Sequence, residues 1–148
     1  MLLLRAAGRS LAVPIRYIVE TMRPLAIQAL ASCPTAIRGL AIIRGLPTPV
    51  VDVANLLGLN PDGTPSGEGR FVTLRLGPRQ VALAVDAVVG LRTLPPSTIE
   101  ALPPLLGDAA QGAVDSIGLL DAELVMVLRA GRLVPDEVWQ ELEARASP

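Results

Sequence analysis

Short aliphatic runs recur along the chain, separated by glycine, proline and polar residues. The runs follow one another at intervals of roughly ten residues and cover residues 2–4, 11–14, 18–22, 37–43, 49–53, 71–76, 81–85, 88–94, 113–119 and 124–128. The run 71–76 alternates between the two faces of a strand. Many short strands joined by turns are typical of a β-sandwich or barrel. The pattern therefore predicts an all-β fold.

Two stretches depart from the strand pattern and predict short helices. Asp52 is a good N-cap for a helix that begins at the next residue and ends at Gly58. Residues 135–146 open with a proline and two acids and close near an arginine, an order that suits the helix macrodipole. Val138 and Leu142 share one face of this second helix. We therefore expect it to dock on the body of the protein.

The segment 60–69 is the least apolar part of the chain and is rich in turn-forming residues. We interpret it as an exposed loop between two sub-barrels, because each half would be marginal as an independent domain. The expected organisation is a single domain over 1–148. Its first sub-barrel covers roughly 11–58 and its second roughly 70–130, followed by the tail helix over 135–146.

Composition and charge exclude several classes of protein. An apolar fraction of 51% with 18% charged residues is not that of a disordered chain. A net charge of −1 and three dispersed aromatic residues give neither the basic patch nor the stacking platforms that nucleic-acid binding needs. Arg5 and Arg9 interrupt the apolar start of the chain, and no window is long enough to span a membrane. We expect a cytoplasmic protein without direct membrane insertion.

The chain also lacks most of the groups that catalysis uses. It contains no histidine, no lysine and a single cysteine, Cys33, which we expect to be a structurally incidental small hydrophobe. No phosphate-binding glycine motif is present. The sequence predicts no enzymatic activity.

The acidic residues show no pattern of a shared site. Isolated acids at the ends of apolar runs are expected to be caps and turn residues: Asp52, Asp86, Asp115 and Asp121. The loop acids Asp62, Glu68 and Asp108 lack the alternate spacing of an oxygen-ligand metal site. We expect neither a metal nor another cofactor, and function must then come from protein surfaces.

Residues 38–52 contain two Arg-Gly pairs six residues apart, followed by a proline-bounded strand. Arg44 stands among aliphatic residues, and an arginine in such a setting costs free energy unless it is paired. Glu20, the acid within the apolar run 18–22, is the best candidate for its partner. The alternative is an ordinary surface arginine whose aliphatic stem lies along the sheet.

The segment Ala36-Ile-Arg-Gly-Leu-Ala-Ile-Ile-Arg-Gly-Leu-Pro-Thr-Pro-Val-Val-Asp-Val resembles the central signature of CheW-like domains. Three further segments, 13–22, 80–90 and 118–128, resemble the early, middle and last strands of that family in the same order. The sequence departs from the family where an asparagine often precedes Leu-Arg-Gly, because Ile42 stands there.

The resemblance implies two packed, five-stranded SH3-like barrels. It also implies an adaptor that joins the cytoplasmic tip of methyl-accepting chemoreceptors to the regulatory domain of a CheA-type histidine kinase. Both residues of the expected ion pair would lie near a receptor-binding groove between the barrels. The residues expected to contact these partners are Ile18, Glu20, Ile43, Arg44 and Gly45.

Two alternatives remain open from the sequence. The protein could be a CheW-like scaffold in another kinase pathway, such as surface motility or development. It could also be a β-barrel that binds a small molecule, although such a site needs converging polar groups and the sequence offers few. For the kinase, we further expect a contiguous patch of exposed aliphatic side chains at strand ends and turns.

Overall fold

The computed structural model describes residues 1–30, 36–59, 69–94, 100–101, 114–121 and 123–146. Its strands are β1 (Leu2–Ala6), β2 (Arg9–Val13), β3 (Ile18–Met22), β4 (Ile37–Ile43), β5 (Leu46–Asp52), β6 (Arg70–Leu76), β7 (Arg79–Val85), β8 (Ala87–Leu91), β9 (Glu100–Ala101), β10 (Val114–Leu120) and β11 (Glu123–Leu128). The helices are α1 (Val53–Leu56) and α3 (Asp136–Ala146), with 3₁₀ turns at Ile15–Tyr17 and Ala130–Arg132. The predicted all-β class and both predicted helices are confirmed.

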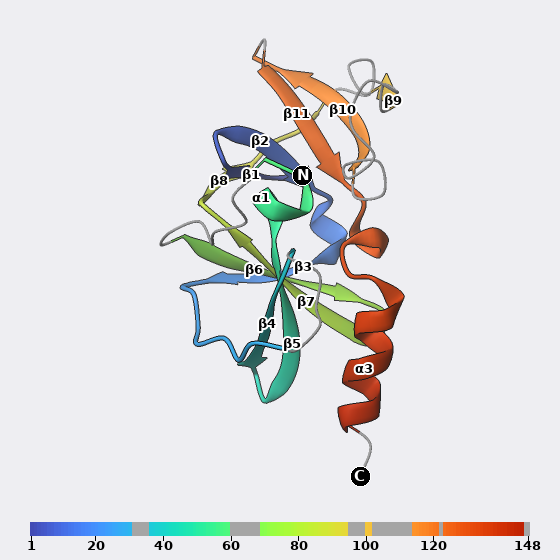
Figure 1. Cartoon of the computed structure of the whole chain (residues 1–148). Coiled ribbons are helices and arrows are strands. Elements are labelled where there is room, and N and C mark those ends of the chain that lie inside the picture. Colours follow the sequence, from blue (N-terminus) through green and yellow to red (C-terminus); the bar gives the residue numbers. More distant parts are fainter. Residues whose placement is uncertain (31–35, 60–68, 95–99, 102–113, 122, 147–148) are drawn as a thin grey trace.

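The strands form two sheets, one above the other in Figure 1. The five-stranded sheet has the order β3-β6-β7-β5-β4, and the six-stranded sheet the order β8-β1-β2-β11-β10-β9. Each sheet contains one parallel pair, β5 with β7 and β2 with β11, while the other pairs are antiparallel. Apart from the two-residue β9, the sheets share one topology if the chain ends are read as joined. This duplication confirms the expected pair of SH3-like barrels.

The expected sub-barrel boundaries, 11–58 and 70–130, do not match the sheets. Strands β6 and β7 pair with β3 and β5 rather than with the later strands, and β2 pairs with β11 near the other end of the chain. The five-stranded sheet is therefore continuous in sequence from β3 to β7, and both chain ends contribute to the other sheet. Segment 60–69 does not separate the barrels, because the strands on both sides of it belong to one sheet; residues 60–68 and Cys33 lie outside the described residues.

Strands β1, β2, β6 and β7 are buried on both faces. Alternate residues of β7 show this, because Val81, Leu83 and Val85 pack into a core shared by the two sheets. Between them, Ala82 and Ala84 face the interior of their own barrel. Two-sided burial explains why the buried middle parts of these strands are almost continuously apolar, instead of alternating apolar and polar residues. Most of the aliphatic side chains of these four strands are therefore buried.

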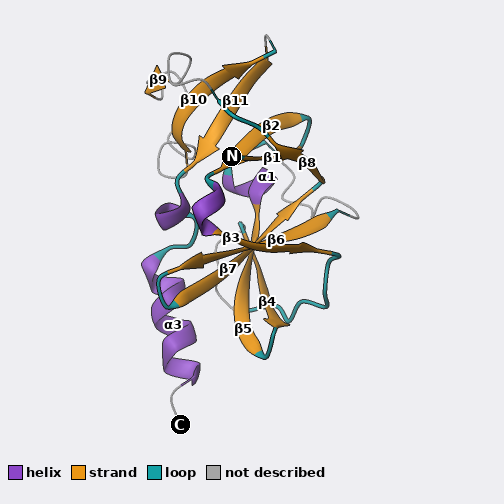
Figure 2. Ribbon diagram, turned by 180° about the vertical axis from the view of Figure 1, so that it is seen from behind, coloured by secondary structure: helices purple, strands orange, loops and turns teal. Residues whose placement is uncertain are grey.

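The shared core also fixes the C-terminal helix. Val138 and Trp139 of α3 are buried with Leu133 in the core between the sheets, and Leu142 packs against it. Arg79 at the start of β7 lies over the ring of Trp139 and pairs with Glu143 at 3.1 Å. The expected docking of this helix is confirmed (Figure 2).

Tight turns connect the hairpins. Arg44 and Gly45, between β4 and β5, have φ values of 54° and 77°, and Ala7 and Gly8, between β1 and β2, have 51° and 76°. Positive φ at both central residues defines the type I′ turn, whose twist matches that of the strands. The Arg-Gly pair at 44–45 is therefore a two-residue hairpin turn.

The glycine of the other Arg-Gly pair has a different role. Gly39 has a φ of 143°, and its neighbour Leu40 exchanges two backbone hydrogen bonds with Gln28, at 2.7 and 2.8 Å. This bridge ties the segment after β3 to the edge of β4. A Cβ atom on Gly39 would overlap the Gln28 carbonyl group.

We predict that Gly39→Ala lowers the free energy of unfolding by roughly 1–3 kcal/mol more than Gly90→Ala. Both glycines have a φ of 143°, so backbone strain is matched, but a Cβ at Gly90 meets no atom within 4 Å. Urea denaturation of the two variants measures the difference. Equal losses would show that the Gln28 segment moves aside without cost.

Candidate functional site

Arg44 and Glu20 form the predicted ion pair. The Arg44 Nη2 atom lies 3.0 Å from Glu20 Oε1, and its Nε donates to Oε2 at 3.2 Å, so that both carboxylate oxygens are used. Hydrogen bonding and charge attraction from Glu20 raise the pKa of Arg44. The pair joins the β4–β5 turn to β3, which lie at opposite edges of the five-stranded sheet.

Arg44 does not lie in the aliphatic setting that the sequence predicted for it. The Arg44 side chain is 75% exposed rather than enclosed by aliphatic residues, whereas that of Glu20 is 27% exposed. Left-handed backbone at the turn carries the arginine out of the barrel. Its guanidinium therefore stays accessible to a partner while Glu20 fixes its direction.

A β-bulge orients Glu20. The register between β3 and β6 shifts between Ile18 and Glu20. The buried Thr73 hydroxyl accepts the Glu20 N–H at 3.2 Å and donates to the Glu20 carbonyl at 3.3 Å. These two bonds hold both the N–H and the carbonyl group of Glu20 to β6 where the ladder is interrupted.

Buried polar residues hold the turn from the other side. The Thr48 hydroxyl donates to the Leu46 carbonyl at 3.0 Å and accepts from Gln80 Nε2 at 3.1 Å. Pro47 and Pro49 lie where β5 pairs with β4 alone, because pairing with β7 begins at Val50. The missing N–H groups of the prolines therefore interrupt no bond to β7. The start of β5, which follows the turn at Arg44, is therefore held in place.

The remaining expected contact residues differ in their exposure to solvent. Gly45 is exposed beside Arg44 in the turn. Ile43 is 2% exposed and packs inside the barrel, so its expected role in contacting a partner is wrong. Alternation along β4 is the cause, since residues 37, 39, 41 and 43 are the buried positions of the strand. Ile18 is half-buried against the shared core.

The same alternation places aliphatic side chains on the outer surface of the barrel. The sequence analysis did not identify them as contact residues. Ile42 is 64% exposed and Leu46 is 46% exposed, and they precede and follow the Arg44-Gly45 turn. We call the surface formed by Ile42, Arg44, Gly45 and Leu46 the hairpin tip. Strand β5 leaves this tip and runs toward α1 and the six-stranded sheet, so the tip lies at the far end of its barrel (Figure 1). The expected location near a groove between the barrels is therefore wrong.

The first Arg-Gly pair contributes a second ion pair that the sequence did not reveal. Arg38 Nε donates to Asp52 Oδ2 at 2.9 Å, and Arg38 Nη2 lies 2.8 Å from the same oxygen. Asp52 is fully buried, and its Oδ1 accepts the Asn55 N–H at 3.1 Å as the N-cap of α1. One carboxylate thus caps the helix and neutralises Arg38. Both ends of the Arg38–Asp52 segment are locked together beneath the hairpin.

The other acids hold local structure. Asp86 Oδ2 accepts the Ala7 N–H at 2.9 Å in the β1–β2 turn, and Asp121 has a φ of 51° in the turn after β10. The side chain of Asp115 and residues 62, 68 and 108 lie outside what is described. Within the described part of the chain, no group of three or more histidine, cysteine or acidic residues could hold a metal ion. No helix of that part is both long and apolar enough to cross a membrane.

Comparisons with known proteins place this geometry in context. The family model of the CheW-like domain matches residues 1–138. The crystal structure of the scaffolding protein TtCheW from Thermoanaerobacter tengcongensis matches with a TM-score of 0.74 at 22% sequence identity, covering 86% of this chain and 86% of that chain. No curated protein matches the sequence. The structural likeness shows the shared fold, and the match to the family model includes both barrels.

We predict that Arg38→Ala costs about 3 kcal/mol of unfolding free energy, because it leaves the buried Asp52 carboxylate without its charge partner. Arg75→Ala is the control, since Arg75 is exposed on β6 and should change stability little. Chemical denaturation of both variants gives the comparison. Similar small losses would mean that the Arg38–Asp52 pair contributes nothing to the fold.

Proposed function

Since the chain belongs to the CheW-like domain family, we propose that it is a non-enzymatic adaptor that couples methyl-accepting chemoreceptors to a CheA-type histidine kinase in chemotaxis. The observation that carries the proposal is the family match over residues 1–138, which spans both barrels. An adaptor of this kind needs two separate contact surfaces on one rigid body. The structure offers a candidate surface on each sheet.

The first surface is the hairpin tip, which we assign to the receptor. Its exposed Arg44 guanidinium is held in place by Glu20, and Ile42 and Leu46 supply apolar area on both sides. Arginine anchors surrounded by apolar contacts are enriched among the residues that dominate binding energy. Because the tip is already ordered, little conformational entropy is lost when a partner binds.

The second surface is the free edge of β8, which we assign to the kinase. Among the described strands, β8 pairs only with β1, so its other edge is open. Val89 is 50% exposed and Leu91 is 66% exposed on this strand, and none of its five residues is charged. An uncharged, apolar edge is a template for pairing with another chain. A regulatory domain built from similar barrels presents strands that could extend the sheet.

We expect Arg44→Ala to raise the dissociation constant for a receptor-tip fragment on the order of 30-fold, as for a hot-spot arginine. The urea midpoint should change little, because the Arg44 side chain is 75% exposed. Isothermal titration calorimetry against the fragment measures the effect, with Arg75→Ala as the control. Unchanged affinity in Arg44→Ala would remove the hairpin tip from the receptor contact.

Leu91→Glu should weaken binding to the kinase regulatory domain on the order of tenfold or more, because it buries a charge at the proposed contact. Leu124→Glu is a matched control, since Leu91 and Leu124 are each 66% exposed but lie on β8 and β11. Biolayer interferometry with the immobilised kinase domain compares the two. Equal weakening by both variants, or by neither, would refute the assignment to the β8 edge.

A further inference from the structure

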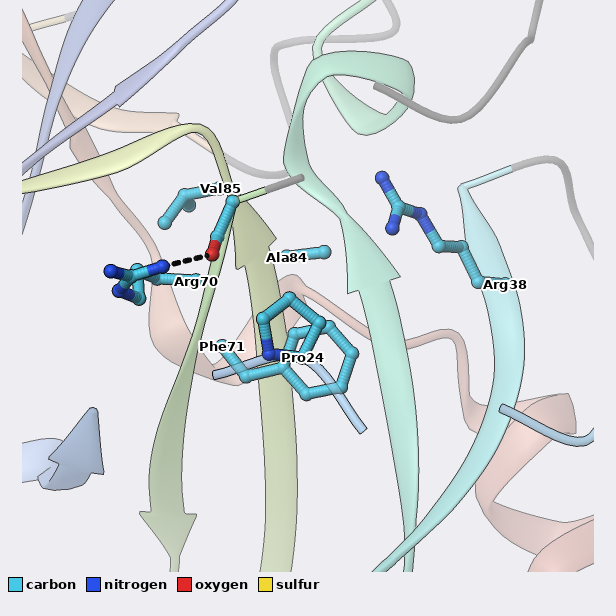
Figure 3. A pocket seen from close by; sticks show the side chains of 7 residues that line it. Pro24, Arg38, Arg70, Phe71, Ala84 and Val85 are labelled. Atoms are coloured by element: carbon cyan, nitrogen blue, oxygen red, sulfur yellow. Dashed lines mark hydrogen bonds between the residues drawn. The ribbon is translucent and has the colours of Figure 1, made fainter. Parts of the chain in front are cut away.

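One end of the five-stranded barrel opens into an apolar hollow. Its volume is about 250 Å³, and Pro24, Phe71 and Val85 are among the residues that line it. Phe71 belongs to the barrel interior, so the hollow is the mouth of that barrel. In Figure 3, Arg70 and Arg38 flank Pro24 and Phe71 from opposite sides. Barrel mouths are common places for binding sites.

Two arginines at this mouth form no ion pair with any carboxylate in the described part of the chain. Arg70 is exposed, and its Nη1 donates at 2.8 Å to the carbonyl of Gly69, its own neighbour. Arg23 and Arg70 together line an adjoining hollow of about 420 Å³. Neither has a charge partner in that part of the chain, whereas Arg38, which also lines the apolar hollow, pairs with Asp52. In a chain with a net charge of −1, this is a local concentration of positive charge.

One acid beside the mouth, Asp86, is engaged elsewhere. Asp86 lines a third hollow together with Arg70. Its Oδ2, however, accepts the Ala7 N–H at 2.9 Å, which directs the carboxylate toward the β1–β2 turn. No ion pair links Asp86 to Arg70 within the described part of the chain. The charge of Asp86 therefore marks one border of the positive region.

We propose that this barrel mouth binds an acidic segment of a partner protein. A carboxylate of the segment pairs with Arg70 and Arg23, since a guanidinium matches a carboxylate with two parallel hydrogen bonds. An adjacent apolar side chain of the segment fills the hollow over Phe71. The hollow of about 250 Å³ over Phe71 can take an apolar side chain, while the adjoining hollow of about 420 Å³ beside Arg23 and Arg70 can take the carboxylate. This inference is independent of the hairpin tip and the β8 edge.

The test uses two short peptides of opposite charge, acetyl-Asp-Leu-Glu-Leu-Asp-amide and acetyl-Lys-Leu-Lys-Leu-Lys-amide, titrated into the ¹⁵N-labelled full chain. We expect the acidic peptide to shift the amide resonances of Gly69, Arg70 and Ala84 in a saturable way. The shifts should weaken as salt is added. Arg70→Glu and Arg23→Glu should each abolish saturation. Arg75→Glu, on the same strand as Arg70 but outside the hollows, should bind like the parent chain.

Several results would overturn the proposal. The absence of a saturable shift, equal shifts with the basic peptide, or unchanged binding by Arg70→Glu would each do so. Inorganic phosphate is titrated in parallel, and if it reproduces and competes for the same shifts, the mouth is a simple anion site. If the spectrum of Arg70→Glu shows unfolding, the neutral Arg70→Met replaces it, with at least a several-fold loss of affinity expected. Binding of receptor and kinase fragments is measured separately, so the two proposals can fail independently.

Discussion

The core between the two sheets is the constraint on which the rest of the structure depends. Strands β1, β2, β6 and β7 send one set of side chains into this core and the alternate set into their own barrel. On β7, for example, Ala82 and Ala84 face the barrel interior beside Phe71, while Val81, Leu83 and Val85 fill the space between the sheets. A shift of one residue in the register of any of these strands would exchange the two sets. The packing therefore specifies the relative position of the barrels.

A rigid body of this kind leaves strand ends, turns and edges as the places where a partner can be recognised. The two Arg-Gly pairs have different roles, one in stabilising the fold and one at the surface. Arg38 and Asp52 lock β4 to the start of α1 beneath the surface, whereas Arg44 projects from the hairpin tip and is only steadied by Glu20. The glycines differ in the same way. Gly45 completes a turn in open space, and Gly39 admits the Gln28 backbone.

Local features were predictable from the sequence, and long-range pairing was not. Asp52 as an N-cap and the docked tail helix follow from residue types within short windows, whereas the Arg44–Glu20 pair, 24 positions apart, was reached with the family resemblance. The parallel pairing of β2 with β11 does not, because it joins residues over 110 positions apart and nothing local specifies it. The burial of Ile43 and exposure of Ile42 could have been inferred from alternation along β4. The Arg38–Asp52 pair could not be inferred in this way. The sequence pattern of a capping aspartate is the same whether or not the carboxylate also pairs with an arginine.

The central claim is that this chain joins two proteins at once through separate surfaces of one body. Analytical ultracentrifugation of the chain mixed with a kinase regulatory domain and a receptor-tip fragment tests it most directly. We predict one sedimenting species that contains all three components, and no association between kinase and receptor fragments when the chain is omitted. Two binary complexes that exclude each other, or no complex with either fragment, would contradict the account.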